Sequence, residues 1–143
     1  MKVTQLSIFL ENKKGRLAEV TKVLALNNVN IRSLFIADTS DFGILRIIVN
    51  DPQSAYDILK ENQFTVSKND VVAVEIPDEP GGLSNVLDLI DRNELNVEYL
   101  YCFVDHCKNT AVDIMRFEDV DRAVSVLEGA NVKMLGVDEI SAL

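Results

Sequence analysis

The strongest constraint on the fold of this 143-residue chain is an internal repeat. Gly15-Arg16-Leu17 aligns with Gly81-Gly82-Leu83 at an offset of 66 residues, and Asn30-Ile31 aligns with Asn96-Val97 at the same offset. Further along, Asp51 aligns with Glu118 at an offset of 67, and residues 55–59 align with residues 123–127 at an offset of 68, which fits single-residue insertions in two loops. Because a glycine turn and two amphipathic stretches recur in the same order, the sequence predicts two copies of one module, residues 1–69 and 70–143.

Within each copy, strand-like and helix-like hydrophobic patterns alternate. Apolar residues recur at every second position over residues 6–10 and at helical spacing over residues 17–24. Asp51-Pro52 is a typical helix start, and Gly129 is expected to cap the last long helix. The expected strands cover residues 6–10, 31–37, 42–49, 64–67, 71–76, 97–104, 110–117 and 131–135, with turns at 39–41 and 68–70 and four helices between the strands.

The resulting order, strand–helix–strand–strand–helix–strand, is that of the ferredoxin-like fold. The predicted fold class is α+β, with two ferredoxin-like βαββαβ modules, each an antiparallel sheet with its helices on one face. The hairpin strands are apolar on both faces, since Ile44 and Ile48 fall on one face and Leu45 and Ile47 on the other. Helices cover only one face, so the face that carries Ile44 and Ile48 should be covered by the other module or by another chain.

Composition and charge narrow the class of protein. The formal net charge is −9, and Lys13-Lys14 is the densest basic segment, which argues against nucleic-acid binding. No apolar run is long enough to span a bilayer, and the N-terminus lacks the features of a secretion signal, so we expect a cytoplasmic protein. Cys102 and Cys107 should then be reduced. Together with His106 they do not have the spacing of a zinc site.

The most informative segments for function are the two turns between the first strand and first helix of each copy. Glycine lets the backbone approach a ligand closely, and the free N–H groups of the following helix attract a carboxylate. Asn12 or Asp78 could face a ligand ammonium group, which together would suit a free amino acid. The same spacing also fits a plain strand-to-helix turn in which Asn12 or Asp78 caps the helix.

Both turns resemble the strand–loop–helix signature of ACT domains, in which Asp or Asn, one residue, and Pro-Gly precede a Leu. Asp78-Glu79-Pro80-Gly81-Gly82-Leu83 matches it fully, whereas Asn12-Lys13-Lys14-Gly15-Arg16-Leu17 has Lys14 in place of the proline. Lys14 adds positive charge near the helix start, so the first site should prefer a more acidic ligand or serve only in packing.

The resemblance implies an amino acid bound at the interface between two such modules, and regulation of an associated enzyme. The ligand-binding residues that it predicts are Asn12, Gly15, Arg16, Leu17 and Asn30 in the first copy, and Asp78, Pro80, Gly81, Gly82, Leu83 and Asn96 in the second. Asn30 and Asn96 would close the pocket from a neighbouring module. A homodimer is the expected assembly.

An enzyme is the weakest of three functional interpretations. His106 and Cys107 fall at the expected tip of a hairpin and lack a third orienting group, so no catalytic set, cofactor or metal is predicted. The stripe Tyr99–Tyr101–Phe103 fits either sheet packing or a pocket lining. The two remaining interpretations are an amino-acid-binding regulatory protein and a regulatory subunit that acts mainly through contact with a metabolic enzyme.

Overall fold

The computed structural model describes residues 1–38, 41–105 and 109–142. Contacts divide the chain into two units, here called module 1 (Thr4–Asn69) and module 2 (Asp70–Leu143 together with Met1–Val3). His106 and Cys107 lie outside the described residues.

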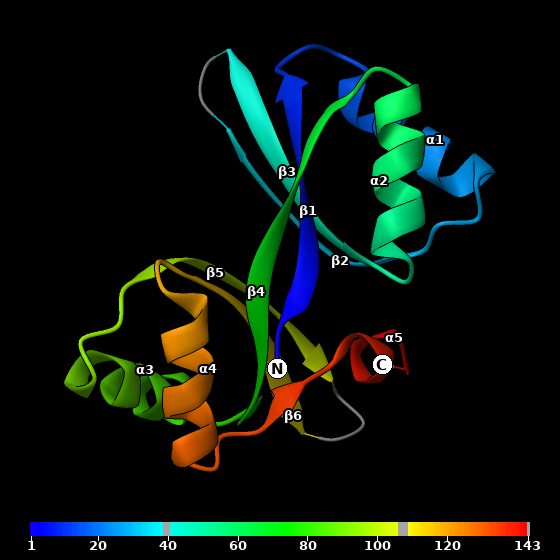
Figure 1. The fold of residues 1–143 in the computed structure, drawn as a ribbon. Coiled ribbons are helices and arrows are strands. Elements are labelled where there is room, and N and C mark those ends of the chain that lie inside the picture. The colour runs from blue at the N-terminus through cyan, green and yellow to red at the C-terminus, as the bar shows by residue number, and fades with distance from the viewer. Residues whose placement is uncertain (39–40, 106–108, 143) are drawn as a thin grey trace. The chain divides into compact units, whose positions relative to one another are not determined.

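Module 1 contains a four-stranded antiparallel sheet with two helices on one face (Figure 1). Its strands follow the order β2-β3-β1-β4, and β3 pairs antiparallel with both β1 and β2. Its elements are β1 (Val3–Glu11), α1 (Arg16–Leu26), β2 (Ile31–Asp38), β3 (Phe42–Val49), α2 (Pro52–Glu61) and the first part of β4 (Thr65–Pro77).

Module 2 repeats this arrangement with the order β7-β4-β6-β5. Its elements are the second part of β4, α3 (Gly82–Arg92), β5 (Val97–Asp105), β6 (Thr110–Phe117), α4 (Val120–Gly129), β7 (Met134–Leu135) and α5 (Val137–Ala142). The predicted fold class, α+β with two ferredoxin-like modules, is therefore confirmed.

Three local expectations were wrong, and one short helix was not predicted. Residues 68–70 form no turn, because β4 is one strand of 13 residues that belongs to both modules. The last strand is only Met134–Leu135, and the short helix α5 that follows it had no sequence signal that we recognised. Gly129 is the last residue of α4 rather than its cap, and the left-handed residue that ends this turn is Asn131, with φ +57°.

The structure also corrects the alignment of the two copies. Asp51 caps α2 and Asp119 caps α4, each accepting a hydrogen bond from the backbone N–H three residues on, so Asp51 is equivalent to Asp119 rather than to Glu118. In module 1, Leu45 of β3 pairs with Ile36 of β2, and in module 2 Asp113 of β6 pairs with Cys102 of β5 in the same way. Leu45 is therefore equivalent to Asp113. Both extra residues of the second copy therefore lie in one connection, between its second and third strands, and not in two loops.

Each module has its own hydrophobic core between its sheet and its helices. In module 1 the core includes Leu6, Ile8, Leu24, Ile47 and Leu59. In module 2 it includes Val72, Val86, Met115, Phe117 and Leu127. These residues fix the face of each sheet on which the helices lie.

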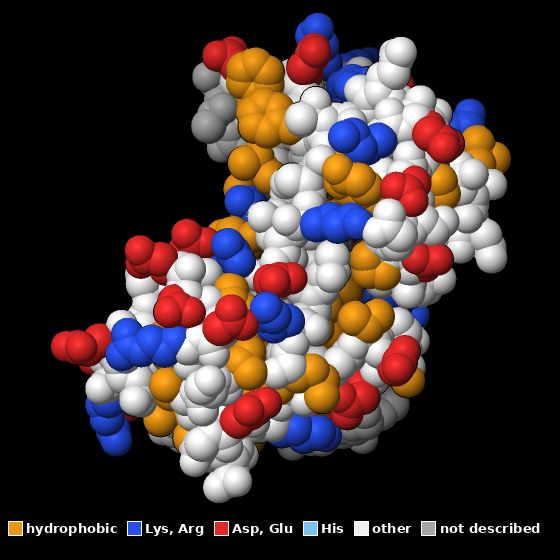
Figure 2. Space-filling model, viewed as in Figure 1, with side chains coloured by type: hydrophobic (Ala, Val, Ile, Leu, Met, Phe, Trp, Pro, Cys, Tyr) orange, Lys and Arg blue, Asp and Glu red, His pale blue; other side chains and the backbone are white. Residues whose placement is uncertain are grey.

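The opposite, helix-free face of module 1 is covered only in part. Ile48 is 1% exposed, whereas Ile44 is half-buried. Phe9 and Phe42 are 47% and 46% exposed, and their ring centroids lie 5.4 Å apart. Figure 2 shows hydrophobic side chains gathered near the β2–β3 end of this module.

Candidate functional site

The two turns that precede α1 and α3 have the same backbone structure. We call them loop 1 (residues 12–15) and loop 2 (residues 78–81). The N–H of Asn12 donates to the carbonyl of Asp41 at 2.9 Å, and the N–H of Asp78 donates to the carbonyl of Asn109 at 3.1 Å. Each loop is thereby tied to the segment that precedes the third strand of its module. The repeat therefore extends to individual hydrogen bonds.

Glycine, and not Asn or Asp, caps the helix after each loop. Gly15 and Gly81 both occupy the left-handed region, and neither helix has a side-chain hydrogen bond at its cap. The interpretation of Asn12 and Asp78 as helix caps is therefore wrong. The N–H of the first helical residue already donates within the loop, from Arg16 to the carbonyl of Lys13 and from Gly82 to the carbonyl of Glu79. An anion at either helix start would therefore interact with the N–H groups of the residues that follow.

Loop 1 borders a pocket of about 270 Å³. Asn12, Arg16 and Leu17, all predicted from the sequence, line it. The described residues that line it are Leu10, Glu11, Asn12, Lys13, Arg16, Leu17, Ile36 and Gly43. One wall is apolar and the other carries charged and amide groups, which suits a small ligand with a polar end.

Two cationic side chains lie at this pocket, and each is paired with a carboxylate. Lys13 lies 2.6 Å from Glu11, and its hydrogen bond and charge lower the pKa of the Glu11 carboxyl group. Arg16 lies 2.7 Å from Glu19, and its guanidinium sits 5.1 Å from the centroid of the Phe64 ring. These contacts hold the Arg16 side chain at the pocket. Its positive charge therefore lies beside the first turn of α1.

Loop 2 is more tightly closed against its own strand. Gly82, the first residue of α3, is buried, and a Cβ atom there would lie 2.3 Å from the carbonyl oxygen of Pro77. Asp78, Pro80 and Gly81 are exposed. Leu83 is half-buried and packs against the core of module 2.

Asn30 and Asn96 lie away from the loop of their own module. The Asn30 N–H donates to Oδ1 of Asn50 at 2.9 Å, just after β3 ends. The Asn96 carbonyl accepts from the N–H of Glu118 at 3.2 Å, just after β6 ends. Loop 1 is hydrogen-bonded to the segment before the start of β3, and loop 2 to the segment before the start of β6. Each asparagine thus lies at the other end of the strand, away from the loop of its own module.

Sequence reasoning missed Asp113, a buried carboxylate of module 2. It lies on the helix-facing side of β6, where its cross-strand partner on β5 is Cys102. It is 2% exposed, and burial raises the pKa of its carboxyl group. The signal was present, because an acidic residue interrupts an apolar alternation, but the incorrect alignment obscured its equivalence to Leu45.

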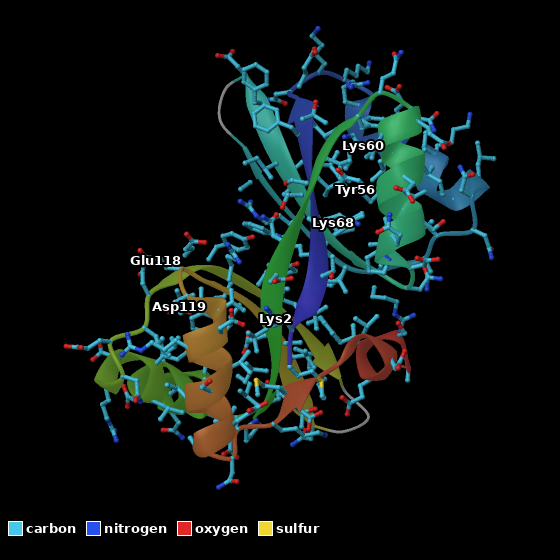
Figure 3. All side chains as sticks on the ribbon, in the orientation of Figure 1. Lys2, Tyr56, Lys60, Lys68, Glu118 and Asp119 are labelled. Atoms are coloured by element: carbon cyan, nitrogen blue, oxygen red, sulfur yellow. The ribbon has the colours of Figure 1, made fainter. Side chains whose placement is uncertain are left out.

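A second pocket of module 1, also of about 270 Å³, lies at the start of α2 and is lined by Thr4, Asp51, Pro52, Gln53 and Lys68. Lys68 donates to Gln53, and its ammonium group lies 4.5 Å from the Tyr56 ring centroid. Lys60 lies 5.5 Å from the centroid of the same ring. Figure 3 labels Tyr56 and both lysines. The contacts order these lysines on the surface of module 1.

Other kinds of site find no support in the described part of the chain. Among residues 1–38, 41–105 and 109–142, no three His, Cys, Asp or Glu side chains are grouped so that they could hold a metal ion. None of the helices in these ranges is long and apolar enough to cross a membrane. Tyr99, Tyr101 and Phe103 lie on the helix-free face of the sheet, where Tyr101 is buried.

The repeated fold and the glycine-capped helices after loops 1 and 2 define a pair of small ferredoxin-like modules. A family model described as an ACT domain pair matches residues 1–143, and the chain belongs to this family. No curated protein matches the sequence.

Two solved structures illustrate the range of the likeness. A Bacteroides thetaiotaomicron protein is 44% identical, with a TM-score of 0.94 over 100% of this chain and 98% of that one. The ligand-free regulatory subunit of aspartate kinase from Thermus thermophilus is 13% identical, with a TM-score of 0.63 over 89% of this chain and 91% of that one. The second likeness is one of fold alone.

Proposed function

We propose that this ACT domain pair is a non-catalytic regulatory protein that binds an amino acid at loops 1 and 2. The observation that carries the proposal is the pocket beside loop 1, which combines an apolar wall with Asn12, Lys13 and Arg16. The ligand carboxylate would lie at the first turn of α1, near Arg16, and the ligand side chain would contact Leu17 and Ile36.

The size of the pocket supports a small ligand. A volume of about 270 Å³ is slightly below the range typical of drug-sized ligands, which begins at roughly 300 Å³. The positive charge of Lys13 and Arg16 favours a ligand with a net negative end. In module 2 the corresponding contacts would come from Asp78, Pro80, Gly81, Gly82 and Leu83.

Regulation would arise if the protein has two conformations and the ligand binds one of them more tightly. The ligand would then shift the equilibrium towards that conformation by no more than its difference in affinity for the two. We place the protein in the cytoplasm as a homodimer, with Asn30 and Asn96 of a second copy closing the sites.

A second candidate function is that of a regulatory subunit that acts mainly by contact with a metabolic enzyme. The exposed pair Phe9 and Phe42 favours it, because exposed apolar patches often mark interaction surfaces. The aspartate kinase regulatory subunit with the same fold is a precedent for such an assembly.

A thermal-shift screen of the standard amino acids on the purified full chain tests the first proposal, because a ligand of the native state raises the melting temperature. The amino acid with the largest shift is then titrated by calorimetry into Leu17→Ala and Leu26→Ala. Leu17 lines the pocket and is 43% exposed, whereas Leu26 is 76% exposed at the other end of α1.

The expected result is an affinity at least several-fold weaker for Leu17→Ala and unchanged for Leu26→Ala. If no amino acid shifts the melting temperature, the proposed amino-acid-binding function is wrong. The regulatory subunit that acts by contact with an enzyme is then the favoured function. If both variants bind as the wild type does, the ligand site is not the pocket beside loop 1.

A further inference from the structure

We propose that module 2 binds the ammonium group of a small ligand through the buried carboxylate of Asp113, which lies below loop 2. The inference rests on the proposed function, because it names the charge partner of the module 2 site. It also gives that site a selectivity for cationic groups that the pocket of module 1 lacks.

The first step is that Asp113 lacks a protein partner for part of its carboxylate. It is only 2% exposed, and its Oδ2 atom is fully buried with no hydrogen-bond partner among the described residues. Burial of an unpaired carboxylate is costly, and native proteins nearly always satisfy such groups. A donor from outside the chain would therefore be bound favourably there.

Three cationic side chains of module 2, Arg116, Lys133 and Lys2, are paired with groups other than Asp113. Arg116 lies 3.2 Å from Glu98 and also donates to the carbonyl of Asp70. Lys133 lies 2.8 Å from Glu75. Lys2, labelled in Figure 3, lies 3.0 Å from Asp121.

The internal repeat places Asp113 beside the region of module 2 that corresponds to the pocket of module 1. The pocket of module 1 is lined by Leu10, Asn12, Ile36 and Gly43, whose equivalents in module 2 are Ile76, Asp78, Cys102 and Ala111. Asp113 pairs with Cys102 and follows Ala111 by two positions on β6, so the three side chains share the helix-facing side of the sheet. Asp113 thus neighbours two positions, Cys102 and Ala111, whose counterparts Ile36 and Gly43 line the pocket of module 1, while its own counterpart, Leu45, belongs to the adjoining core.

The position is close to solvent even though Asp113 itself is covered. Cys102 is exposed on β5, the strand at the end of the module 2 order. Burial raises the pKa of the Cys102 thiol, and the charges of Asp113 and Asp78 raise it further. Both carboxylates therefore act on the same point, one from the sheet and one from loop 2, where an ammonium group would be attracted by both.

Module 1 has Leu45 at the position of Asp113, and Leu45 is part of its apolar core. Its pocket is lined by the cationic side chains Lys13 and Arg16 together with Glu11, which pairs with Lys13. The two sites consequently differ in charge, because the described lining of the module 1 pocket has more cationic than anionic side chains, whereas Asp113 adds a buried carboxylate in module 2.

Calorimetric titration of the full chain tests the proposal with three probes that carry ammonium groups: L-lysine, L-norleucine and 1,5-diaminopentane. Norleucine has only the α-ammonium group, and the diamine has no carboxylate, so the three arms show which ammonium group is recognised. Each probe is titrated into the wild type, Asp113→Asn, Asp113→Leu and the control Asp88→Asn, which removes an exposed carboxylate on α3. Circular dichroism confirms folding, and Asp113→Leu reproduces the residue of module 1.

A second readout locates the binding. In a Cys107→Ser background Cys102 is the remaining cysteine of the sequence, so its rate of modification by a thiol reagent reports on the region beside Asp113. The bound probe should slow this rate at least several-fold in the Cys107→Ser protein and leave it unchanged when Asp113→Leu is added.

The expected result is that at least one probe binds the wild type and loses affinity at least tenfold in both Asp113 variants, but not in Asp88→Asn. Amino-acid binding that is unchanged in the Asp113 variants overturns the inference and leaves the proposed function standing. Binding of the diamine alone, dependent on Asp113, supports the inference while the proposed function fails. If no probe binds the wild type, Asp113 is a buried structural carboxyl group and the inference is wrong.

Discussion

Gly15 and Gly81, the residues before the first helix of each module, have the same backbone conformation, with φ +89° and ψ −10°. This conformation costs a residue with a Cβ atom about 1–2 kcal/mol. Among the described residues other than the two chain neighbours, no atom lies within 4 Å of the position that a Cβ atom would take at either glycine. The requirement for glycine is therefore one of backbone conformation and not of space.

Gly15→Ala and Gly81→Ala should each lower the free energy of unfolding by about 1–2 kcal/mol, because only backbone strain is added. Urea unfolding measures the change. Gly129→Ala is a matched control, since Gly129 lies within α4 with open space around its Cβ position. It should raise the stability by up to ~1 kcal/mol, and destabilisation by this control would contradict the conformational explanation.

Gly82→Ala should cost more than Gly81→Ala, for a steric reason. The new Cβ would meet the backbone carbonyl of Pro77 at 2.3 Å, and a backbone atom cannot move as the end of a side chain does. We expect a loss of about 1–3 kcal/mol or more, together with a change in loop 2. Chemical shifts or amide exchange of Asp78 and Leu83 would report the change in the loop. A Gly82→Ala protein as stable as the wild type would show that loop 2 is less closed than described.

Asp51 and Asp119 begin α2 and α4 in equivalent ways; Asp119 is labelled in Figure 3. Their carboxylates accept from the N–H groups of Ser54 and Arg122, each at 3.0 Å. Substitution of either by Ala should destabilise the protein by about 1 kcal/mol. The two losses should add in the double variant, because the caps belong to different modules. Asp88→Ala, which changes an exposed mid-helix residue, provides the control.

Much of the fold could be predicted because the repeat and the hydrophobic periods are local signals. The helix start at Asp51 and the hairpin strands were correctly predicted, since capping chemistry and alternation are visible in the sequence. The continuity of β4 through residues 68–70 was not, because a polar triplet has turn propensity but Asn69 is held by a long-range bond to Ser7 at 2.6 Å. Tertiary contacts override local preference there.

The candidate site could be predicted from the sequence where it depends on glycine and not where it depends on the alignment of the two copies. The φ value of Gly15 follows from a glycine before an amphipathic helix. Asp113 could be recognised only once the position of the inserted residues was known, which required the strand registers. An offset error of one residue assigns a strand residue to the opposite face, so the buried carboxylate did not stand out.

The burial of Asp113 makes stability depend on pH in a definite direction. Its pKa is raised in the folded protein, so the native state binds more protons than the unfolded state between the usual Asp pKa, about 3.9, and the raised value. The free energy of unfolding of the wild type should therefore fall as pH rises through this window.

The leucine of Asp113→Leu cannot ionise, so this variant should not show this pH dependence. The stability difference, Asp113→Leu minus wild type, should grow with pH and then level off. Urea unfolding at a series of pH values measures the difference, and Asp88→Asn corrects for general loss of a carboxylate. Parallel curves for wild type and Asp113→Leu would mean that the carboxyl group is already neutralised by a partner in the folded protein.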